Sequence, residues 1–102
     1  MPRIAALCLL LVATPVLANP DLPQARKSEL EHMVIQDCGS CHGLTMKGGL
    51  GSPLTAQALA GAAPDTLAAV ILDGIPGTAM PRWRPLLTET EAQWIAEYLL
   101  ET

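Results

Sequence analysis

Apolar residues recur at three- and four-residue steps over Gln24–Cys38, the first long stretch after the N-terminal leader. Leu30, Met33 and Val34 would fall on one face of a helix built from these residues. No turn signal separates this stretch from the residues that follow it. The pattern therefore predicts a helix over Gln24–Cys38 that runs straight into the next segment.

A second helix is predicted between Ala63 and Gly74. Pro64 suits the first helical turn, and Asp65 places a carboxylate near the positive end of the helix dipole. Gly74 favours the end of the helix because glycine adopts the left-handed backbone conformation without strain. The predicted apolar face consists of Leu67, Val70 and Ile71.

A third helix is predicted at the C-terminal end of the chain. Thr88 and Glu91 have the spacing of a capping box, in which each side chain accepts a hydrogen bond from the other residue's backbone amide. Ile95, Tyr98 and Leu99 recur at helical steps and would face the core.

The connecting segments are rich in turn residues. Glycines punctuate residues 43–52, and prolines and glycine interrupt 75–87, so neither segment predicts a regular helix or a central strand. Thr55 could cap a short helix over Ala56–Ala60. Because no stretch of useful length has the alternation of a strand, the sequence predicts an all-α domain of three main helices plus loops.

Residues 1–18 have the features of an export signal. Arg3 gives a positive start, and an apolar run follows over 4–13, including Cys8 as one of its small apolar residues. We expect cleavage after Ala18, which leaves one small domain over residues 19–102. The run is too short to span a bilayer comfortably, so we expect no stable membrane insertion after cleavage, with an uncleaved anchor as the alternative.

The segment Cys38-Gly39-Ser40-Cys41-His42 is the C-x-x-C-H signature of covalent haem c attachment. Two intervening residues let one helical turn present both thiols to the same side of a porphyrin, whose vinyl groups they would join as thioethers. His42 would then fall under the iron as its proximal ligand. Thioether formation requires reduced thiols outside the cytoplasm, so the motif and the export signal support each other and indicate the periplasm.

Other uses of these residues fit less well. A redox dithiol usually follows a strand in an α/β fold, and no such pattern occurs here. A structural zinc site needs four ligands, but beyond the motif the chain offers only His32, and no cysteine lies downstream. A plain disulfide would leave His42 unexplained.

A closed haem site needs a second axial ligand opposite His42. Met80 lies far along the chain in a loop rich in proline and glycine, and Pro81 restricts it to extended conformations. We therefore choose Met80 as the sulfur ligand, with an apolar gap-filling role as its alternative. The other candidates lie close to the motif in sequence and are His32, Met33 and Met46.

Charge and size limit the function further. The chain has 10 acidic and 6 basic residues and a formal net charge of −4, which makes it a poor nucleic-acid binder. A small domain buries a limited core, so a covalently attached haem would also stabilise it. The basic residues Lys47, Arg82 and Arg84 could line a docking face near the haem, or could be ordinary solvated charges.

The chain resembles class I c-type cytochromes over nearly all of residues 24–102, on the C-x-x-C-H motif and on Pro76-Gly77-Thr78-Ala79-Met80-Pro81. The segments 36–44, 48–51 and 77–87, with the closing Trp94-Ile95, resemble more narrowly the cytochrome c55X (NirC) proteins of denitrification nitrite-reductase gene clusters.

The resemblance implies a class I fold wrapped around one haem, with Cys38 and Cys41 as attachment points. It also implies that Thr78 hydrogen-bonds a haem propionate and that Tyr98 lies where the last helix meets the first. Trp83 could lie against the haem edge or be a partly buried packing residue. The implied haem-packing positions are Leu54, Leu67 and Ile71.

The chain departs from the family pattern at three places. Ser52 stands where relatives often have the proline whose carbonyl orients the imidazole, so the carbonyl used here is open. Leu30 and Val34 replace a glycine and an aromatic residue at the helix crossing, which predicts a wider crossing packed by aliphatic side chains with Trp94 and Tyr98. Val70 offers no hydroxyl to the Met80 sulfur.

We expect a monomeric periplasmic electron carrier with one haem c and no enzymatic activity. The resemblance implies cytochrome cd1 nitrite reductase, or a protein that matures its d1 haem, as the redox partner. One alternative is a haem enzyme or ligand sensor in which a small ligand displaces Met80. Another is a protein in which haem serves only to stabilise the fold.

Overall fold

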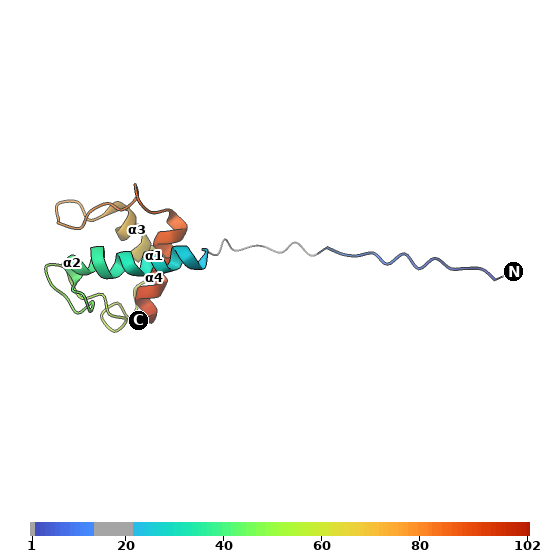
Figure 1. Ribbon diagram of the computed structural model, residues 1–102, viewed down its shortest axis with the longest axis horizontal. Helices are drawn as coiled ribbons and strands as arrows, with labels where there is room; N and C mark the ends of the chain where they lie inside the picture. The colour runs from blue at the N-terminus through green and yellow to red at the C-terminus, as the bar shows by residue number, and fades with distance from the viewer. Residues whose placement is uncertain (1, 14–21) are drawn as a thin grey trace.

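The computed structural model describes residues 2–13 and 22–102, and the regular secondary structure of these residues is entirely helical. No strand occurs in these residues, and none of their helices is long and apolar enough to cross a membrane. The elements are α1 (Gln24–Met33), the π-helical turn η1 (Val34–Cys38), α2 (Gly39–His42), α3 (Pro64–Asp73) and α4 (Glu89–Glu101). Figure 1 shows α1, η1 and α2 as one continuous rod. The all-α prediction is confirmed, and so is the first helix, which carries a π-helical turn at its end.

The helix ends follow the local signals. At α4, the Glu91 amide donates to Thr88 Oγ1 at 3.1 Å, and the Thr88 amide donates to Glu91 Oε1 at 2.9 Å. This confirms the predicted capping box. At α3, Pro64 occupies the first turn, and Gly74 ends the helix at a φ of 67°. The predicted short helix over residues 56–60 is a hydrogen-bonded turn instead. Thr55 caps it, with its carbonyl and hydroxyl accepting the Leu59 and Ala58 amides, but the pattern does not continue, because the Ala60 amide donates to the Gln57 carbonyl, three residues back, at 3.4 Å.

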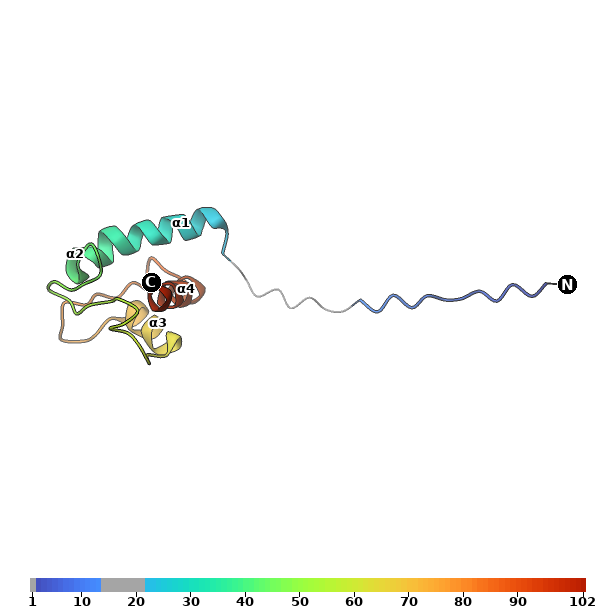
Figure 2. The same ribbon diagram turned by 90° about the horizontal axis from the view of Figure 1, so that it is seen from below.

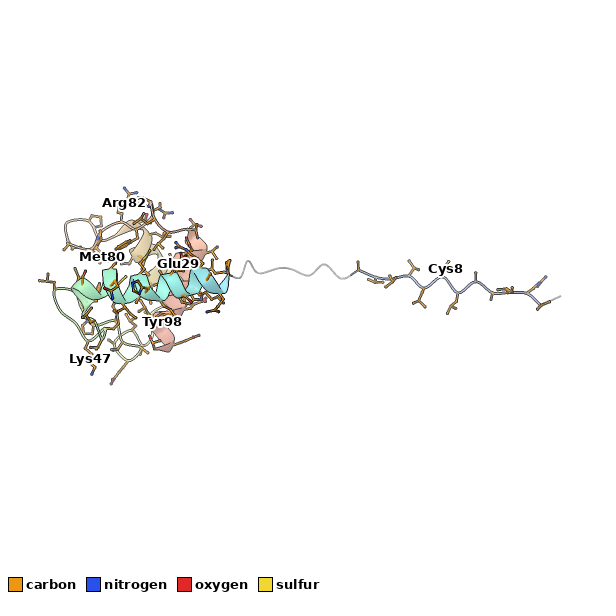
Figure 3. All side chains as sticks on the ribbon, viewed as in Figure 1. Cys8, Glu29, Lys47, Met80, Arg82 and Tyr98 are labelled. Atoms are coloured by element: carbon orange, nitrogen blue, oxygen red, sulfur yellow. The ribbon has the colours of Figure 1, made fainter. Side chains whose placement is uncertain are left out.

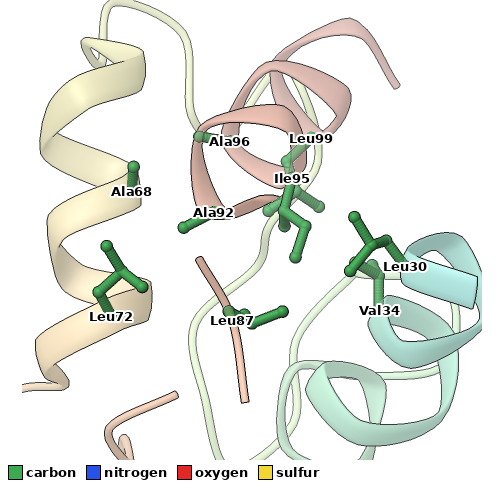
Figure 4. Packing of buried hydrophobic residues seen from close by; sticks show 9 residues of the cluster. All are labelled: Leu30, Val34, Ala68, Leu72, Leu87, Ala92, Ile95, Ala96 and Leu99. Carbon is green, nitrogen blue, oxygen red and sulfur yellow. The ribbon is translucent and has the colours of Figure 1, made fainter. Parts of the chain in front are cut away.

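The core lies where α1 and η1 cross α4 and where α3 packs on the other side of α4 (Figure 4). Leu30, Val34 and Ile95 are at most 2% exposed, so aliphatic side chains fill the crossing as expected. Trp94 and Tyr98 pack against this cluster while stacking on each other, with ring centroids 5.2 Å apart. The buried apolar residues are Leu30, Val34, Ala68, Leu72, Leu87, Ala92, Ile95, Ala96 and Leu99.

The predicted apolar face of α3 is only partly right. Ala68 and Leu72 are the buried residues of α3, whereas Leu67 and Ile71 are partly buried on a neighbouring face. Ala68 and Leu72 belong to one cluster with Ala92 of α4, and small side chains let two helices approach closely. Leu67 and Ile71 keep part of their surface exposed, which a further apolar group can cover.

Both long loops lie at the end of the molecule where α2 stops. Figure 2 shows the loop after α2 (residues 43–63) and the loop after α3 (residues 74–88) both below the α1–α2 rod, whereas in Figure 1 they lie apart, on opposite sides of that rod. Residues 38–42 and Met80 are thus carried by elements that meet at one end of the fold.

Candidate haem site

The π-helical turn determines where the two motif cysteines lie. The Gly39 amide donates to the Val34 carbonyl, five residues back, instead of to the usual carbonyl four residues back. Along this rod the buried residues are Leu30, Val34 and Gly39. Successive buried residues are therefore four positions apart before the π-helical turn and five positions apart across it. Cys38 therefore lies partly exposed at the rim of the core instead of inside it.

Neither Cys38 nor Cys41 forms a disulfide. Burial raises the pKa of the Cys38 thiol, and the neighbouring Asp37 carboxylate adds to that increase. A thiol with a raised pKa has little thiolate at neutral pH, which is the opposite of a reactive redox cysteine. The two sulfurs, three residues apart across η1 and α2, suit attachment to one side of a flat cofactor better than thiol–disulfide exchange.

His42, the last residue of α2, is held from two directions. Its Nδ1 lies 2.7 Å from the Ser52 carbonyl oxygen, which can only accept, so Nδ1 carries the proton. Gly51 packs against the imidazole: a Cβ there would be 2.7 Å from the ring atoms Cε1 and Nδ1. Ser52 is therefore the carbonyl that the sequence left open, and Nε2 remains as the unprotonated nitrogen available to a metal.

The loop after α2 is tied to the motif by backbone hydrogen bonds. The Gly48 amide donates to the His42 carbonyl and the Gly51 amide to the Cys41 carbonyl, both at 2.8 Å. Met46 adopts a φ of 59°, and its methyl group lies 3.4 Å from the position a Gly39 Cβ would take. Met46 is thus packed onto α2, on the segment that carries His42.

Met80 lies in a loop that is hydrogen-bonded within itself. The Ile75 amide donates to the Met80 carbonyl at 3.3 Å, and the Met80 amide donates to Thr78 Oγ1 at 3.3 Å. The Thr78 hydroxyl donates to the Ile75 carbonyl at 2.7 Å. Its proton is therefore used inside the loop, and the predicted propionate bond of Thr78 stays a prediction.

The predicted apolar contacts come from three separate segments that pack against the core yet remain partly exposed; they are Leu54, Leu67, Ile71 and Trp83. The Trp83 amide donates to the Ile71 carbonyl at 3.1 Å, which places its backbone beside the end of α3. Partial exposure of large apolar side chains around the core of a small domain favours an additional apolar group against them. Together with the free Nε2 of His42, these residues fit a haem.

The basic residues near the site are not equivalent. The Arg84 guanidinium binds Asp73 through Nε and a terminal nitrogen, both at 2.9 Å, and lies 3.5 Å from Glu89. These bonds raise the pKa of Arg84 and lower that of Asp73. Figure 3 shows Lys47 and Arg82 at well-separated points of the surface. Asp73 and Glu89 already neutralise the charge of Arg84. Of the three basic residues suggested for a docking face, Lys47 and Arg82 therefore remain, and these two lie far apart.

Two residues of this region were not expected from the sequence. Gly51 could have been found from the cluster of glycines at 48, 49 and 51, since such clusters mark close backbone approach. Asp73 could have been found from its place at the negative end of a helix, where a carboxylate is unfavourable unless a cation accompanies it.

Among the described residues, no three His, Cys, Asp or Glu side chains converge as a metal cluster.

The fold and the residues of this site define a class I c-type cytochrome. A family model described as cytochrome C oxidase, cbb3-type, subunit III matches residues 25–99. Cytochrome c55X of Paracoccus denitrificans is 63% identical over 102 residues, which are 100% of this chain and 97% of that protein. Cytochrome c55X of Pseudomonas aeruginosa is 46% identical over 87 residues, covering 85% and 73%. The chain belongs to the cytochrome c55X family of haem c proteins.

Solved structures agree with this assignment. A c-type cytochrome NirC superposes with a TM-score of 0.76 at 45% identity, over 78% of this chain and 94% of that one. The dihydro-heme d1 dehydrogenase NirN, in complex with DHE, superposes with a TM-score of 0.63 at 33% identity. That match covers 69% of this chain but 15% of NirN, so one part of that larger enzyme resembles this fold.

Proposed function

We propose that the protein is a periplasmic one-electron carrier with a single haem c, attached through Cys38 and Cys41 and ligated by His42 and Met80. The observation that carries the proposal is the bond between His42 Nδ1 and the Ser52 carbonyl, because it fixes the ring and leaves Nε2 for iron. When bound, the haem supplies an iron that alternates between the ferrous and ferric states.

The chain's own residues account for carrier behaviour. His42 is oriented by the Ser52 carbonyl, and the Met80 loop is closed by its own hydrogen bonds. Leu54, Leu67 and Ile71 would exclude water from the iron. Two protein ligands leave no position for a substrate, which favours electron transfer over catalysis.

Visible spectra and intact mass test this proposal. We expect the mass of the mature chain plus one haem, and a weak far-red band in the ferric protein that marks sulfur–iron ligation. Met80→Ala should abolish the band, whereas Met46→Leu, a matched change on the other long loop, should retain it. High-spin ferric iron with rapid cyanide binding in the unmodified protein would contradict the proposal and favour the ligand-displacement alternative.

We further propose export, with cleavage after Ala18 and a mature domain over 19–102. The cleavage position lies outside the described residues. The large apolar side chains between Ile4 and Val12 are at least 76% exposed, which supports a leader that is not part of the folded core. N-terminal sequencing of protein from the periplasmic fraction should begin at Asn19, and a cytoplasmic or membrane-bound product would contradict this.

The proposed partner is cytochrome cd1 nitrite reductase or a protein that matures its d1 haem. The similarity to NirC supports this pair of partners, and the NirN match supports the second, since that neighbour's printed name is a dihydro-heme d1 dehydrogenase. Deleting the gene separates the two roles. Normal d1 haem content with slowed nitrite reduction indicates electron supply; a loss of d1 haem indicates maturation.

A further inference from the structure

The loop that carries Met80 is fastened at its base to α3. It leaves α3 at Gly74 and returns where the Trp83 amide donates to the Ile71 carbonyl at 3.1 Å and the Arg84 amide to the Leu72 carbonyl at 3.0 Å. Both carbonyls belong to the last turn of α3, where no helical amide follows to satisfy them. The return of the loop thus completes the end of the helix.

Arg84 adds a side-chain lock at the same point. Its guanidinium forms a bidentate pair with Asp73, the last residue of α3, with both N–O distances at 2.9 Å. A third nitrogen lies 3.5 Å from Glu89, the first residue of α4. A single residue therefore joins the loop to the end of one helix and the start of the next.

Asp73 is poorly placed for helix stability. The last turn of a helix carries partial negative charge, and a carboxylate there is unfavourable by itself. The ion pair with Arg84 offsets this unfavourable interaction. The Arg84 hydrogen bond also lowers the pKa of Asp73 and keeps its carboxylate ionised. Removing this carboxylate should therefore loosen the base of the loop without weakening α3, while the two backbone bonds to Ile71 and Leu72 remain.

We propose that the Asp73–Arg84 pair is a positioning clamp that keeps Met80 on the iron and slows the exchange of that sulfur for other ligands. This inference rests on the proposed ligation by Met80. Within the loop, Met80 is tied only to its neighbours Thr78 and Ile75, so its position depends on how the two ends of the loop are held. Asp73 and Arg84 are positioning residues, since neither is argued to touch the haem.

Imidazole binding to the haem-loaded ferric protein tests the clamp, since imidazole reaches the iron only after the sulfur has left. The side chains of Arg84 and Asp73 are 43% and 53% exposed, so solvent weakens the pair. We expect Asp73→Asn and Arg84→Lys to bind imidazole roughly two- to fivefold faster than the unmodified protein, the range expected for a surface ion pair. About 1 M salt should accelerate the unmodified protein but not Asp73→Asn.

Glu29→Gln is the matched control. It removes another surface ion pair, the 2.7 Å contact between Arg26 and Glu29, and both residues belong to α1, which does not carry the Met80 loop. It should leave the imidazole rate unchanged, and its unfolding midpoint should shift by about as little as those of Asp73→Asn and Arg84→Lys, because each variant loses one surface ion pair. Unchanged rates in Asp73→Asn and Arg84→Lys, with the far-red band intact, would overturn the clamp and leave Met80 ligation standing. Equal acceleration in the control, or acceleration that follows a lowered midpoint, would also overturn it. Absence of the band in the unmodified protein would remove both proposals.

Discussion

At the scale of single residues, His42 is prepared for its task by the backbone around it. The Ser52 carbonyl accepts its Nδ1 proton, and Gly51 leaves just enough room for the ring. Neither contribution depends on a polar side chain. The orientation of His42, the proposed iron ligand, therefore depends on the Ser52 carbonyl and on the lack of a side chain at Gly51.

Gly51→Ala should disturb this arrangement. Its backbone is not in the left-handed region, so the effect is steric: the new Cβ would lie 2.7 Å from the ring and force the imidazole to move. We expect a loss of about 1–3 kcal/mol in the free energy of unfolding of the haem-loaded protein, measured in denaturant. Ser52→Ala is the control, since it retains the carbonyl and should be neutral. A Gly51→Ala protein as stable as the original would show that the contact is not tight.

At the scale of helices, one polar cluster joins the start of α4 to α1. Arg26 on α1 binds Glu91, which is 8% exposed and also caps α4 through Thr88. Among the described residues, no buried side-chain nitrogen or oxygen lacks a hydrogen-bond partner. Glu91 thus caps α4 and also binds α4 to α1.

Thr88→Ala removes the side-chain half of the capping box. The Glu91 amide loses its partner, so we expect the free energy of unfolding to fall by about 1 kcal/mol. Urea denaturation of the haem-loaded protein measures this change. Thr88→Ser retains the hydroxyl and should restore most of the loss; an equally unstable serine variant would contradict the capping explanation.

The loss of stability at acidic pH should reflect protonation of the Glu91 carboxylate. The Arg26 hydrogen bond lowers the pKa of Glu91 below its usual 4.5, while burial acts in the opposite direction. A carboxylate with a depressed folded pKa contributes stability that is complete above its unfolded pKa and is lost as the pH falls through the folded one. Stability should therefore decline below about pH 4.5, measured by far-ultraviolet circular dichroism in urea.

Glu91→Gln should flatten that acid decline. Glu97→Gln is the control, because Glu97 is exposed and accepts its side-chain bond from Gln93, four residues back on the same helix. If Glu91→Gln and the unmodified protein lose stability equally on acidification, Glu91 does not carry the effect.

At the scale of the whole molecule, the core is small for a chain without disulfides. Nine apolar residues of the described part are buried, and three of them are alanines. Small domains of this kind usually need an additional source of stability. The partly exposed apolar residues beside the two loops are where a haem would add to the core.

Haem should therefore be required for folding. We expect the Cys38→Ser/Cys41→Ser variant to lose most of its helical circular dichroism signal and to be digested rapidly by protease. Cys8→Ser changes a residue of the leader that cleavage after Ala18 removes, so the exported protein should keep both properties. A cooperative thermal transition in the haem-free double variant would contradict this prediction.

Short-range signals determined much of this protein from the sequence alone. The three helices, the capping box over Thr88 and Glu91, and the end of α3 at Gly74 follow from spacing and from residues a few positions apart. The C-x-x-C-H motif is local in the same way, because one helical turn fixes the relation between its thiols and its imidazole. Such features depend on backbone geometry that neighbouring residues specify.

Only the tertiary structure decided the features that depend on distant segments approaching each other. The carbonyl that holds His42, the burial of Ala68 and Leu72 instead of Leu67 and Ile71, and the pairing of Arg84 with Asp73 all belong to this class. Helical periodicity gives the faces of a helix but not which neighbour covers each face. Packing made that choice, since α4 covers the face of α3 that carries Ala68 and Leu72 and leaves Leu67 and Ile71 partly exposed.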